Sequence, residues 1–317
     1  MRSRTVLAVV AAIALGAGTA TASAAHVTAP RGVGSTAKVV DPGEVPYVFD
    51  VEKAALKNTN FRTAAWTADK LQLTLMSIPV RGDVGLEMHP AVNQFFRIEA
   101  GTAKVMMGTK RLLSFVKIAG PDDVIMIPAG TWHNLVNTGS KPLKMYSLYG
   151  PQQHPRGTVH RTQAEDPHSG DAKPTPRVAA PTPIKPFRAD PGAVPFVFNI
   201  VRATTANTNF RTAAWTTSTL QLTLMDIRGG DDIGVEMHPA VDQFLRIESG
   251  KAKVYVGNRK DSLRVFAVAK AGDAIMIPSG TWHNIINQSR KAPLELYSLY
   301  GPQQHPKGTI HVTKPAE

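Results

Sequence analysis

The stretch Gly85-Leu86-Glu87-Met88-His89-Pro90-Ala91-Val92-Asn93-Gln94-Phe95 carries the residues that decide the fold, and it occurs a second time at residues 234–244. A second stretch, Pro128-Ala129-Gly130-Thr131-Trp132-His133-Asn134, returns in the same way at residues 278–284. In each copy the two stretches supply one carboxylate, two imidazoles and one carboxamide. This combination suits a metal site, and its spacing suits the inside of a β-barrel.

Both stretches belong to a duplicated unit of domain size. Residues 41–101 align without a gap to residues 190–250, and 39 of these 61 positions are identical. A repeat this long is a whole domain and not a solenoid unit. We expect a first domain over residues 41–160 and a second over residues 190–314. The proline-rich stretch 161–189 is predicted to be an extended linker. It could hold two barrels side by side or lay one across the other, and the sequence does not decide.

The pattern within each unit is that of strands. Residues 94–99 alternate between two faces, and other short apolar runs end at glycine or proline. These other runs are residues 71–78, 104–107, 124–127 and 143–149. Many short strands with little helical periodicity indicate an all-β sandwich or barrel.

The spacing of the polar residues predicts a metal site in each copy. Glu87 and His89 are two residues apart, which on a strand puts both side chains on one face, ~7 Å apart. A hairpin at Pro90 would bring Gln94 alongside, and His133 would come from a third strand. The set then holds two histidines, one carboxylate and one neutral oxygen donor, which suits Mn, Fe, Ni or Zn. The second copy repeats it as Glu236, His238, Gln243 and His283.

These motifs resemble those of the cupin superfamily. The first cupin motif reads glycine, five residues, His-x-His, three or four residues, Glu, six residues, glycine. In residues 85–101, which resemble it, His89 stands at the second histidine, four residues lead to position 94, and six more lead to Gly101. The second motif is matched by Pro128-x-Gly130-x-x-His133-x-x-x-Asn137. The resemblance covers essentially all of both repeats. It implies a bicupin, with two tandem double-stranded β-helix, or jelly-roll, barrels, and it suggests a homodimer.

Two positions depart from the cupin pattern. Glu87 stands where the first histidine is usual, and Gln94 stands where the glutamate is usual. Either the metal binds with the carboxylate moved, or Gln94 lies outside the metal's direct ligands and leaves a coordination position open. An open position is what metal catalysis uses. The alternative is a pocket that has lost its metal and serves packing or ligand binding.

The reaction is the least determined part of the interpretation. The protein could be a metal-dependent oxidase or dioxygenase, or an isomerase, acting on a small polar substrate. The site resembles cupin sugar-phosphate isomerases, such as small mannose-6-phosphate-isomerase-like proteins, in its residue types but not in their order. The alternative is a non-catalytic bicupin that binds a carbohydrate or another small ligand. No catalytic residue is assigned from the sequence.

Further repeated residues allow two interpretations each. His154 and His160 follow the last predicted strand, so they could meet a substrate at the barrel mouth or simply cap a loop. Arg62 could clamp a carboxylate or phosphate, or it could be a structural arginine at a strand edge. Their counterparts in the second copy are His305, His311 and Arg211.

The composition restricts the class of protein. The chain of 317 residues has no cysteine, which excludes disulfides and thiolate ligands. The formal charge is +12, but the basic residues are scattered, so no nucleic-acid partner is expected. Residues 1–24 are predicted to be a cleaved secretory signal, followed by a flexible leader over 25–40. We therefore expect a secreted protein with no membrane span after cleavage.

Overall fold

The computed structural model describes residues 40–167 and 176–316. The predicted signal over residues 1–24 and almost all of the predicted leader, residues 25–40, lie outside the described residues. None of the helices in the described part of the chain is long and apolar enough to cross a membrane.

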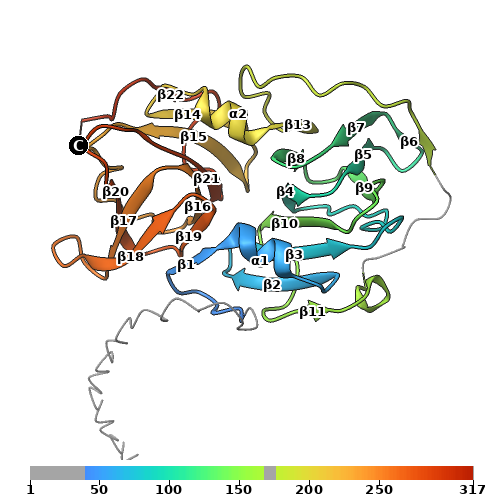
Figure 1. Cartoon of the computed structure of the whole chain (residues 1–317), viewed down its shortest axis with the longest axis horizontal. Coiled ribbons are helices and arrows are strands. Elements are labelled where there is room, and N and C mark those ends of the chain that lie inside the picture. The colour runs from blue at the N-terminus through green and yellow to red at the C-terminus, as the bar shows by residue number, and fades with distance from the viewer. Residues whose placement is uncertain (1–39, 168–175, 317) are drawn as a thin grey trace, which may run out of the picture. The chain divides into compact units, whose positions relative to one another are not determined.

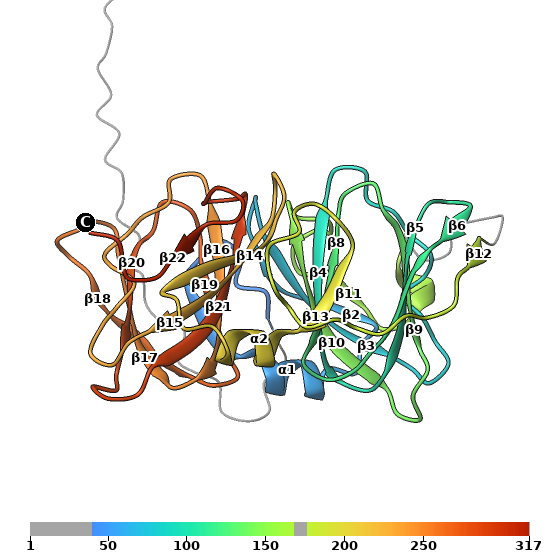
Figure 2. The same cartoon turned by 90° about the horizontal axis from the view of Figure 1, so that it is seen from above.

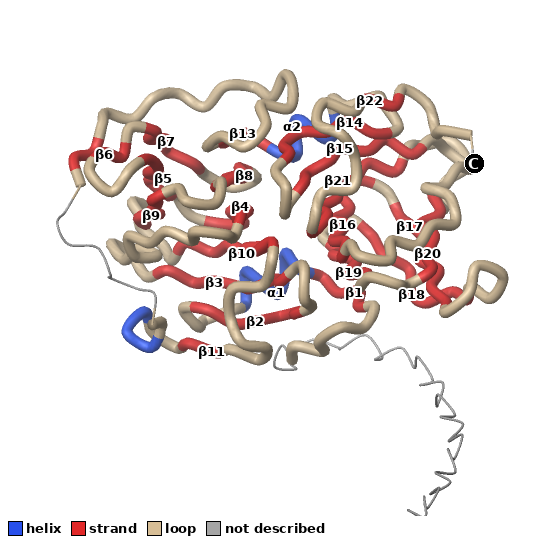
Figure 3. Tube along the Cα trace, turned by 180° about the vertical axis from the view of Figure 1, so that it is seen from behind, coloured by secondary structure: helices blue, strands red, loops and turns tan. Residues whose placement is uncertain are grey.

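Strands are the main regular secondary structure of both repeats (Figure 3, red). The first repeat contains β1 (Tyr47–Asp50), α1 (Val51–Lys57), β2 (Arg62–Thr67), β3 (Gln72–Ile78), β4 (Asn93–Ala100), β5 (Ala103–Gly108), β6 (Leu112–Leu113), β7 (Phe115–Ala119), β8 (Asp123–Ile127), β9 (Trp132–Asn137), β10 (Leu143–Gly150) and β11 (Val159–His160). The connection contains the 3-10 helix η1 (Gln163–Glu165) and β12 (Arg177–Val178). The second repeat contains β13 (Phe196–Asn199), α2 (Ile200–Thr205), β14 (Arg211–Thr216), β15 (Gln221–Ile227), β16 (Asp242–Ser249), β17 (Lys251–Gly257), β18 (Arg264–Lys270), β19 (Asp273–Ile277), β20 (Trp282–Asn287), β21 (Leu294–Gly301) and β22 (Ile310–His311).

Each barrel is built from one seven-stranded and one three-stranded sheet. In the first barrel the strand orders are β11-β2-β3-β10-β4-β8-β13 and β7-β5-β9. In the second they are β1-β19-β16-β21-β15-β14-β22 and β18-β17-β20. All pairings within these four sheets are antiparallel, and a small parallel pair joins β12 to β6. The predicted all-β, two-barrel fold is therefore confirmed.

The two repeats exchange one strand each. β1 comes from the first repeat but pairs with β19 of the second barrel, with Tyr47 opposite Met276. β13 comes from the second repeat and pairs with β8 of the first, with Phe196 opposite Met126. Figure 1 shows β1 beside β19 and β13 beside β8. Each seven-stranded sheet is thus completed by a strand of the other repeat, an arrangement that the duplication alone does not predict.

A short helix follows each exchanged strand. Asp50 caps α1 by accepting a hydrogen bond from the Lys53 amide, and Asn199 caps α2 by accepting one from the Arg202 amide. α1 contacts β3, β4 and β10, and α2 contacts β15, β16 and β21. Figure 2 shows both helices on the same side of the two barrels. Each helix therefore leads the chain from the exchanged strand of one barrel onto the sheet of the other.

Alternate residues of β4 are buried in two different cores. Phe96 and Ile98 point into the first barrel's interior, where they pack with β3, β5 and β8. Phe95 points the other way, into a core shared by both barrels, and its ring centroid lies 6.1 Å from that of Tyr297. A third core fills the second barrel. Both faces of this strand are apolar because one face lines a barrel and the other joins two barrels.

The glycine that ends the first motif has a steric role. Gly101 turns the chain between β4 and β5 with a φ of +94°. A Cβ at this position would lie 2.9 Å from the Leu143 Cα. Glycine is therefore required both by the backbone angle and by the close approach of β10.

Candidate metal centre

Glu87 and His89 lie in an irregular segment before β4, not in the regular strand that their spacing predicts. Isolated bridges are all that pair this segment with β9, and one of them sets Glu87 opposite His133. The Glu87 amide donates to the His133 carbonyl at 3.0 Å, and the reverse bond is 2.9 Å. Gly85 has a φ of +100°, and Pro90 lacks an amide hydrogen, so a longer ladder cannot form here. The single bridge is enough to hold Glu87 beside His133.

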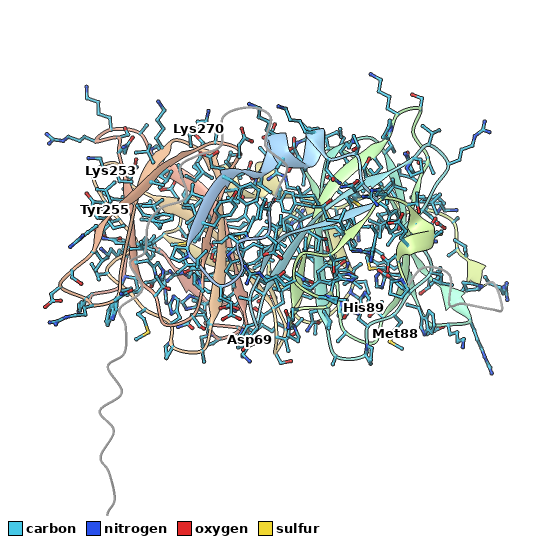
Figure 4. The ribbon with its side chains drawn as sticks, turned by 90° about the horizontal axis from the view of Figure 1, so that it is seen from below. Asp69, Met88, His89, Lys253, Tyr255 and Lys270 are labelled. Carbon is cyan, nitrogen blue, oxygen red and sulfur yellow. The ribbon has the colours of Figure 1, made fainter. Side chains whose placement is uncertain are left out.

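Three side chains converge at this point in the first barrel. Glu87 Oε1 lies 3.2 Å from His133 Nε2 and 3.4 Å from His89 Nε2. The three potential ligand atoms all lie within 4.8 Å of one another, and all three residues are buried. Figure 4 labels His89 at one rim of the first barrel, next to the half-buried Met88. The fold thus brings Glu87 and His89 of the first motif together with His133 of the second motif.

The second barrel repeats this arrangement. Glu236 Oε1 lies 3.4 Å from His238 Nε2 and 3.4 Å from His283 Nε2. Their ligand atoms also lie within 4.8 Å of one another. The two sites differ in access, because the Glu236 side chain is 26% exposed whereas that of Glu87 is 4% exposed. The Glu236 side chain is therefore more accessible to solvent, although its Oε1, the oxygen nearest the two histidines, is buried.

Each barrel has one buried glutamine at the equivalent position of β4 or β16, and only that of the second barrel has a direct contact with its cluster among the described residues. Gln94 donates its Nε2 hydrogen to Ser147 at 3.1 Å, and its buried Oε1 has no hydrogen-bond partner among the described residues. Gln243 donates in the same way to Ser298, and its Oε1 lies 3.0 Å from His283 Nε2. A buried carbonyl oxygen without a donor is costly. Both amide oxygens are therefore suited to serve as a fourth ligand.

The hydrogen bonds of the histidines fix which nitrogen faces the cluster. His133 Nδ1 lies 2.9 Å from the Thr131 carbonyl, and His283 Nδ1 lies 2.9 Å from the Thr281 carbonyl. A carbonyl only accepts, so Nδ1 carries the hydrogen and a neutral ring presents the lone pair of Nε2. That lone pair faces the Glu87 carboxylate, which also only accepts. Two acceptors at this distance need a proton or a cation between them, so the donor set fits a metal ion.

The charge of the carboxylates agrees with this role. Burial alone would raise the pKa of Glu87, but the imidazoles of His133 and His89, which hydrogen-bond to its carboxylate when a proton and not a metal cation lies between them, hold this pKa well below its usual range. The pKa of Glu236 is lowered in the same way by His238 and His283. Both carboxylates are therefore ionised at neutral pH, as a metal ligand must be.

A series of contacting, buried polar side chains leads from the first cluster to Arg62 and Asp166. Arg62 donates from Nε and Nη2 to Asp166 Oδ2 at 3.0 and 2.8 Å, and from Nη1 to the Tyr149 hydroxyl. The Tyr149 ring lies edge-on to His89 with centroids 6.1 Å apart. Edge-on contacts then connect Tyr149 to His154 and His154 to His160. Arg62 is thus a structural arginine with a carboxylate partner, which is one of the two interpretations that its sequence allows.

Two residues of this series of contacts, Tyr149 and Asp166, were not identified from the sequence. Tyr149 ends β10 in the repeated Tyr-Gly-Pro-Gln-Gln-His-Pro block, and this repetition was a signal that could have identified it. Asp166 gave a weaker signal, because it lies beyond the last repeated block and only the acidic type of its side chain recurs in the aligned Glu317.

Comparisons with known proteins show which family the two repeats match. Residues 74–149 and 223–300 each match the family model described as "Cupin domain". The uncharacterized protein YrkC of Bacillus subtilis is 50% identical over 126 residues, which are 39% of this chain and 68% of that protein. The crystal structure of BH2720 from Bacillus halodurans is 50% identical, covers 40% of this chain and 96% of its own, and has a TM-score of 0.39. Oxalate decarboxylase of Lactobacillus farciminis is 15% identical, with 75% and 78% of the chains covered and a TM-score of 0.49.

The family match falls once in each repeat, and the relative with 50% identity covers one repeat over more than two thirds of its own length. The matched segments run from β3 to β10 in the first repeat and from β15 to β21 in the second, so each includes all the residues of its cluster. The chain therefore belongs to the cupin family and contains two cupin domains.

Proposed function

We propose that the protein is a metal-dependent bicupin enzyme that acts on a small polar substrate. One divalent ion would be held in the first barrel by Glu87, His89 and His133, with Gln94 as a neutral fourth ligand. The second barrel would use Glu236, His238, Gln243 and His283. The observation that carries the proposal is the lone pair of His133 Nε2 facing the Glu87 carboxylate at 3.2 Å.

The chain's own residues prepare this site for a cation. The Thr131 carbonyl orients the His133 ring, and Ser147 orients the Gln94 amide. Glu87 stays ionised, and burial excludes bulk water from its carboxylate. When bound, a divalent ion would supply a Lewis acid, or a redox centre if it is Fe or Mn. A set of two histidines, one glutamate and one glutamine amide suits Mn, Fe, Ni or Zn.

The most direct test is metal analysis together with an X-ray absorption edge on the purified full chain. We expect up to two ions per chain, and Fe or Mn would favour an oxidoreductase whereas Zn would favour an isomerase. His89→Ala should lower the content by about one ion and leave the second site loaded. A chain that stays metal-free after reconstitution with all four metals would overturn the proposal.

A binding protein without turnover is the alternative that this test can separate from an enzyme. The more exposed carboxylate of Glu236 makes the second barrel the first place to look for turnover. Loss of substrate-consuming activity in Glu236→Gln, with metal content unchanged in the first barrel, would support the enzyme. Ligand binding without consumption by the fully metal-loaded protein would favour the binding protein.

The predicted signal adds a proposal on location. Cleavage after Ala24 would give an exported chain that begins at Ala25. N-terminal sequencing of the protein recovered outside the cells would show this residue first. An unprocessed Met1 terminus on the mature protein would contradict export by this route.

A further inference from the structure

The two barrels differ at one buried arginine. In the first barrel Arg62 is fully buried and its guanidinium is paired with Asp166. In the second barrel the equivalent residue is Arg211. It lies opposite His311 of β22 in the strand register, just as Arg62 lies opposite His160 of β11. Arg211 is 5% exposed, and none of the ion pairs among the described residues involves it. Its charge is therefore buried without a counter-charge from the described residues, and burying a charge without a partner is costly.

In the first barrel the Asp166 carboxylate accepts from the buried arginine. The described residues of the second barrel provide no acceptor at the equivalent position. Asp166 Oδ2 accepts from Arg62 Nε at 3.0 Å and lies 3.7 Å from His160 Nδ1. The matching nitrogens, Arg211 Nε and His311 Nδ1, are both buried and have no hydrogen-bond partner among the described residues. Two nitrogens that flank one carboxylate in the first barrel are thus left without an acceptor in the second.

The chain takes the same course up to this point in both repeats. Gln163 donates to Asp83 in the first barrel, and Lys314 donates to the equivalent Asp232 in the second. Asp166 follows three residues after Gln163 and supplies the carboxylate that Arg62 contacts in the first barrel. The residue aligned with it, Glu317, lies outside the described residues. The described residues of the second barrel therefore supply no acid in this place.

The uncompensated charge acts on its surroundings. Burial, together with a smaller contribution from the positive charge of Arg211, lowers the pKa of His305 to about 4. Burial also lowers the pKa of His311, again with a contribution from Arg211. Burial raises the pKa of Tyr300, and Arg211 opposes this rise. Tyr300 lies edge-on to His238 with ring centroids 6.0 Å apart. Arg211 therefore lies within electrostatic reach of the residues beside the second metal cluster.

We propose that Arg211 and His311 form a binding site for the carboxylate group of a small-molecule ligand in the second barrel alone. Arginine recognises a carboxylate through a planar fork of donors, and the bond is stronger when the guanidinium is shielded from water. Asp166 fills the same place in the first barrel and so closes it to such a ligand. The site does not need the metal ion, although it would place a carboxylate ligand close to the second cluster.

Titration with acetate at constant ionic strength tests the site, with the full chain used both metal-free and metal-loaded. The readouts are the imidazole shifts of His311 by NMR and the melting temperature. We expect a saturable shift in both forms of the wild-type protein. Arg211→Met should weaken acetate binding at least about ten-fold, as expected for loss of a hydrogen bond to a charged group. Arg259→Met removes an exposed arginine of the same barrel and should leave the affinity unchanged.

Two further variants keep the test decisive. Arg211→Lys keeps the charge but loses the planar fork, so it should also bind acetate more weakly, and it serves if Arg211→Met does not fold. Glu317→Gln asks whether the chain's own carboxylate fills the site. Acetate binding that appears only in Glu317→Gln, a shift that does not saturate, or equal affinity in wild type and Arg211→Met would each overturn the proposal. Absence of metal with intact acetate binding would count against the proposed function and not against this site.

Discussion

Arg97 of the first barrel donates a hydrogen bond to Glu248 of the second, and both side chains are buried. Arg246 also donates to Glu248, at 2.7 Å, and lies 3.4 Å from Glu99. Two guanidiniums therefore serve two buried carboxylates between the barrels, while Glu52 and Asp122 approach from the edge. The acids outnumber the arginines, so one carboxyl is favoured to keep its proton.

The free energy of unfolding should depend on pH because one of these buried carboxyls keeps its proton in the folded state. Burial raises the pKa of Glu99 to about 8, although Arg97 opposes the rise. The unfolded chain loses the proton near its ordinary pKa, so the folded state binds more protons between these values. Stability from Glu99 is thus present below the unfolded pKa and is lost as pH rises toward 8. Between pH 6 and 8 the loss should reach up to about 2 kcal/mol.

Glu99→Gln removes the titrating group and should remove this part of the pH dependence. Urea unfolding of both proteins at pH 6 and pH 8 measures the effect. We expect the free energy of unfolding of the wild type to fall relative to that of the variant. Glu52→Gln is the control. The Glu52 side chain is 48% exposed, so this substitution should change the pH dependence of the unfolding free energy less. Parallel curves for wild type and Glu99→Gln would contradict the prediction.

The two equivalent arginines should differ in their effect on stability. Arg62→Met leaves Asp166 buried without its partner, and breaking a buried pair costs about 3–5 kcal/mol. Arg211→Met removes an arginine that has no such partner, so we expect a change below about 1 kcal/mol without an added carboxylate. Chemical denaturation of both variants gives the comparison. Equal losses would show that Arg211 also has a structural partner.

The amide oxygens should contribute to metal affinity. Gln94→Ala removes the amide oxygen that is proposed as the fourth ligand and is buried without a hydrogen-bond donor among the described residues, and we expect the affinity of the first site to fall by about 10–100-fold. Ser147→Ala leaves the amide in place but removes its anchor, so the loss should be smaller. Competition with a coloured chelator measures both. An unchanged affinity in Gln94→Ala would exclude the amide from the ligands.

Unfolding of the full chain should be one cooperative transition. β1 and β13 each complete the other repeat's sheet, and Phe95, Tyr146, Phe244 and Tyr297 pack ring against ring in the shared core. Neither barrel can lose its structure without exposing this core. Differential scanning calorimetry should give equal calorimetric and van't Hoff enthalpies. Two resolved transitions would show that the barrels unfold independently.

Much of the fold could be predicted because it depends on local chemistry. The run over residues 71–78 became β3, and the alternating stretch over residues 94–99 became β4. The duplication gave two barrels because each copy carries a complete set of strands. The regular strand expected at Glu87 was wrong, because Gly85 and Pro90 interrupt the ladder there. The two side chains still converge, since one bridge to His133 is enough.

The sequence by itself determined the two β-barrels and the residue types of both clusters, because strand periodicity, turns and metal ligands are read over short distances along the chain. Only the tertiary structure decided which strand completes which barrel, that the outward face of β4 is buried between barrels, and that Arg62 meets Asp166 whereas Arg211 meets no acid among the described residues. Arg62 and Asp166 are brought together across 104 positions of sequence. Contacts of this kind depend on the folded chain and not on local pattern, so two repeats with the same motifs differ in the described partners of this arginine.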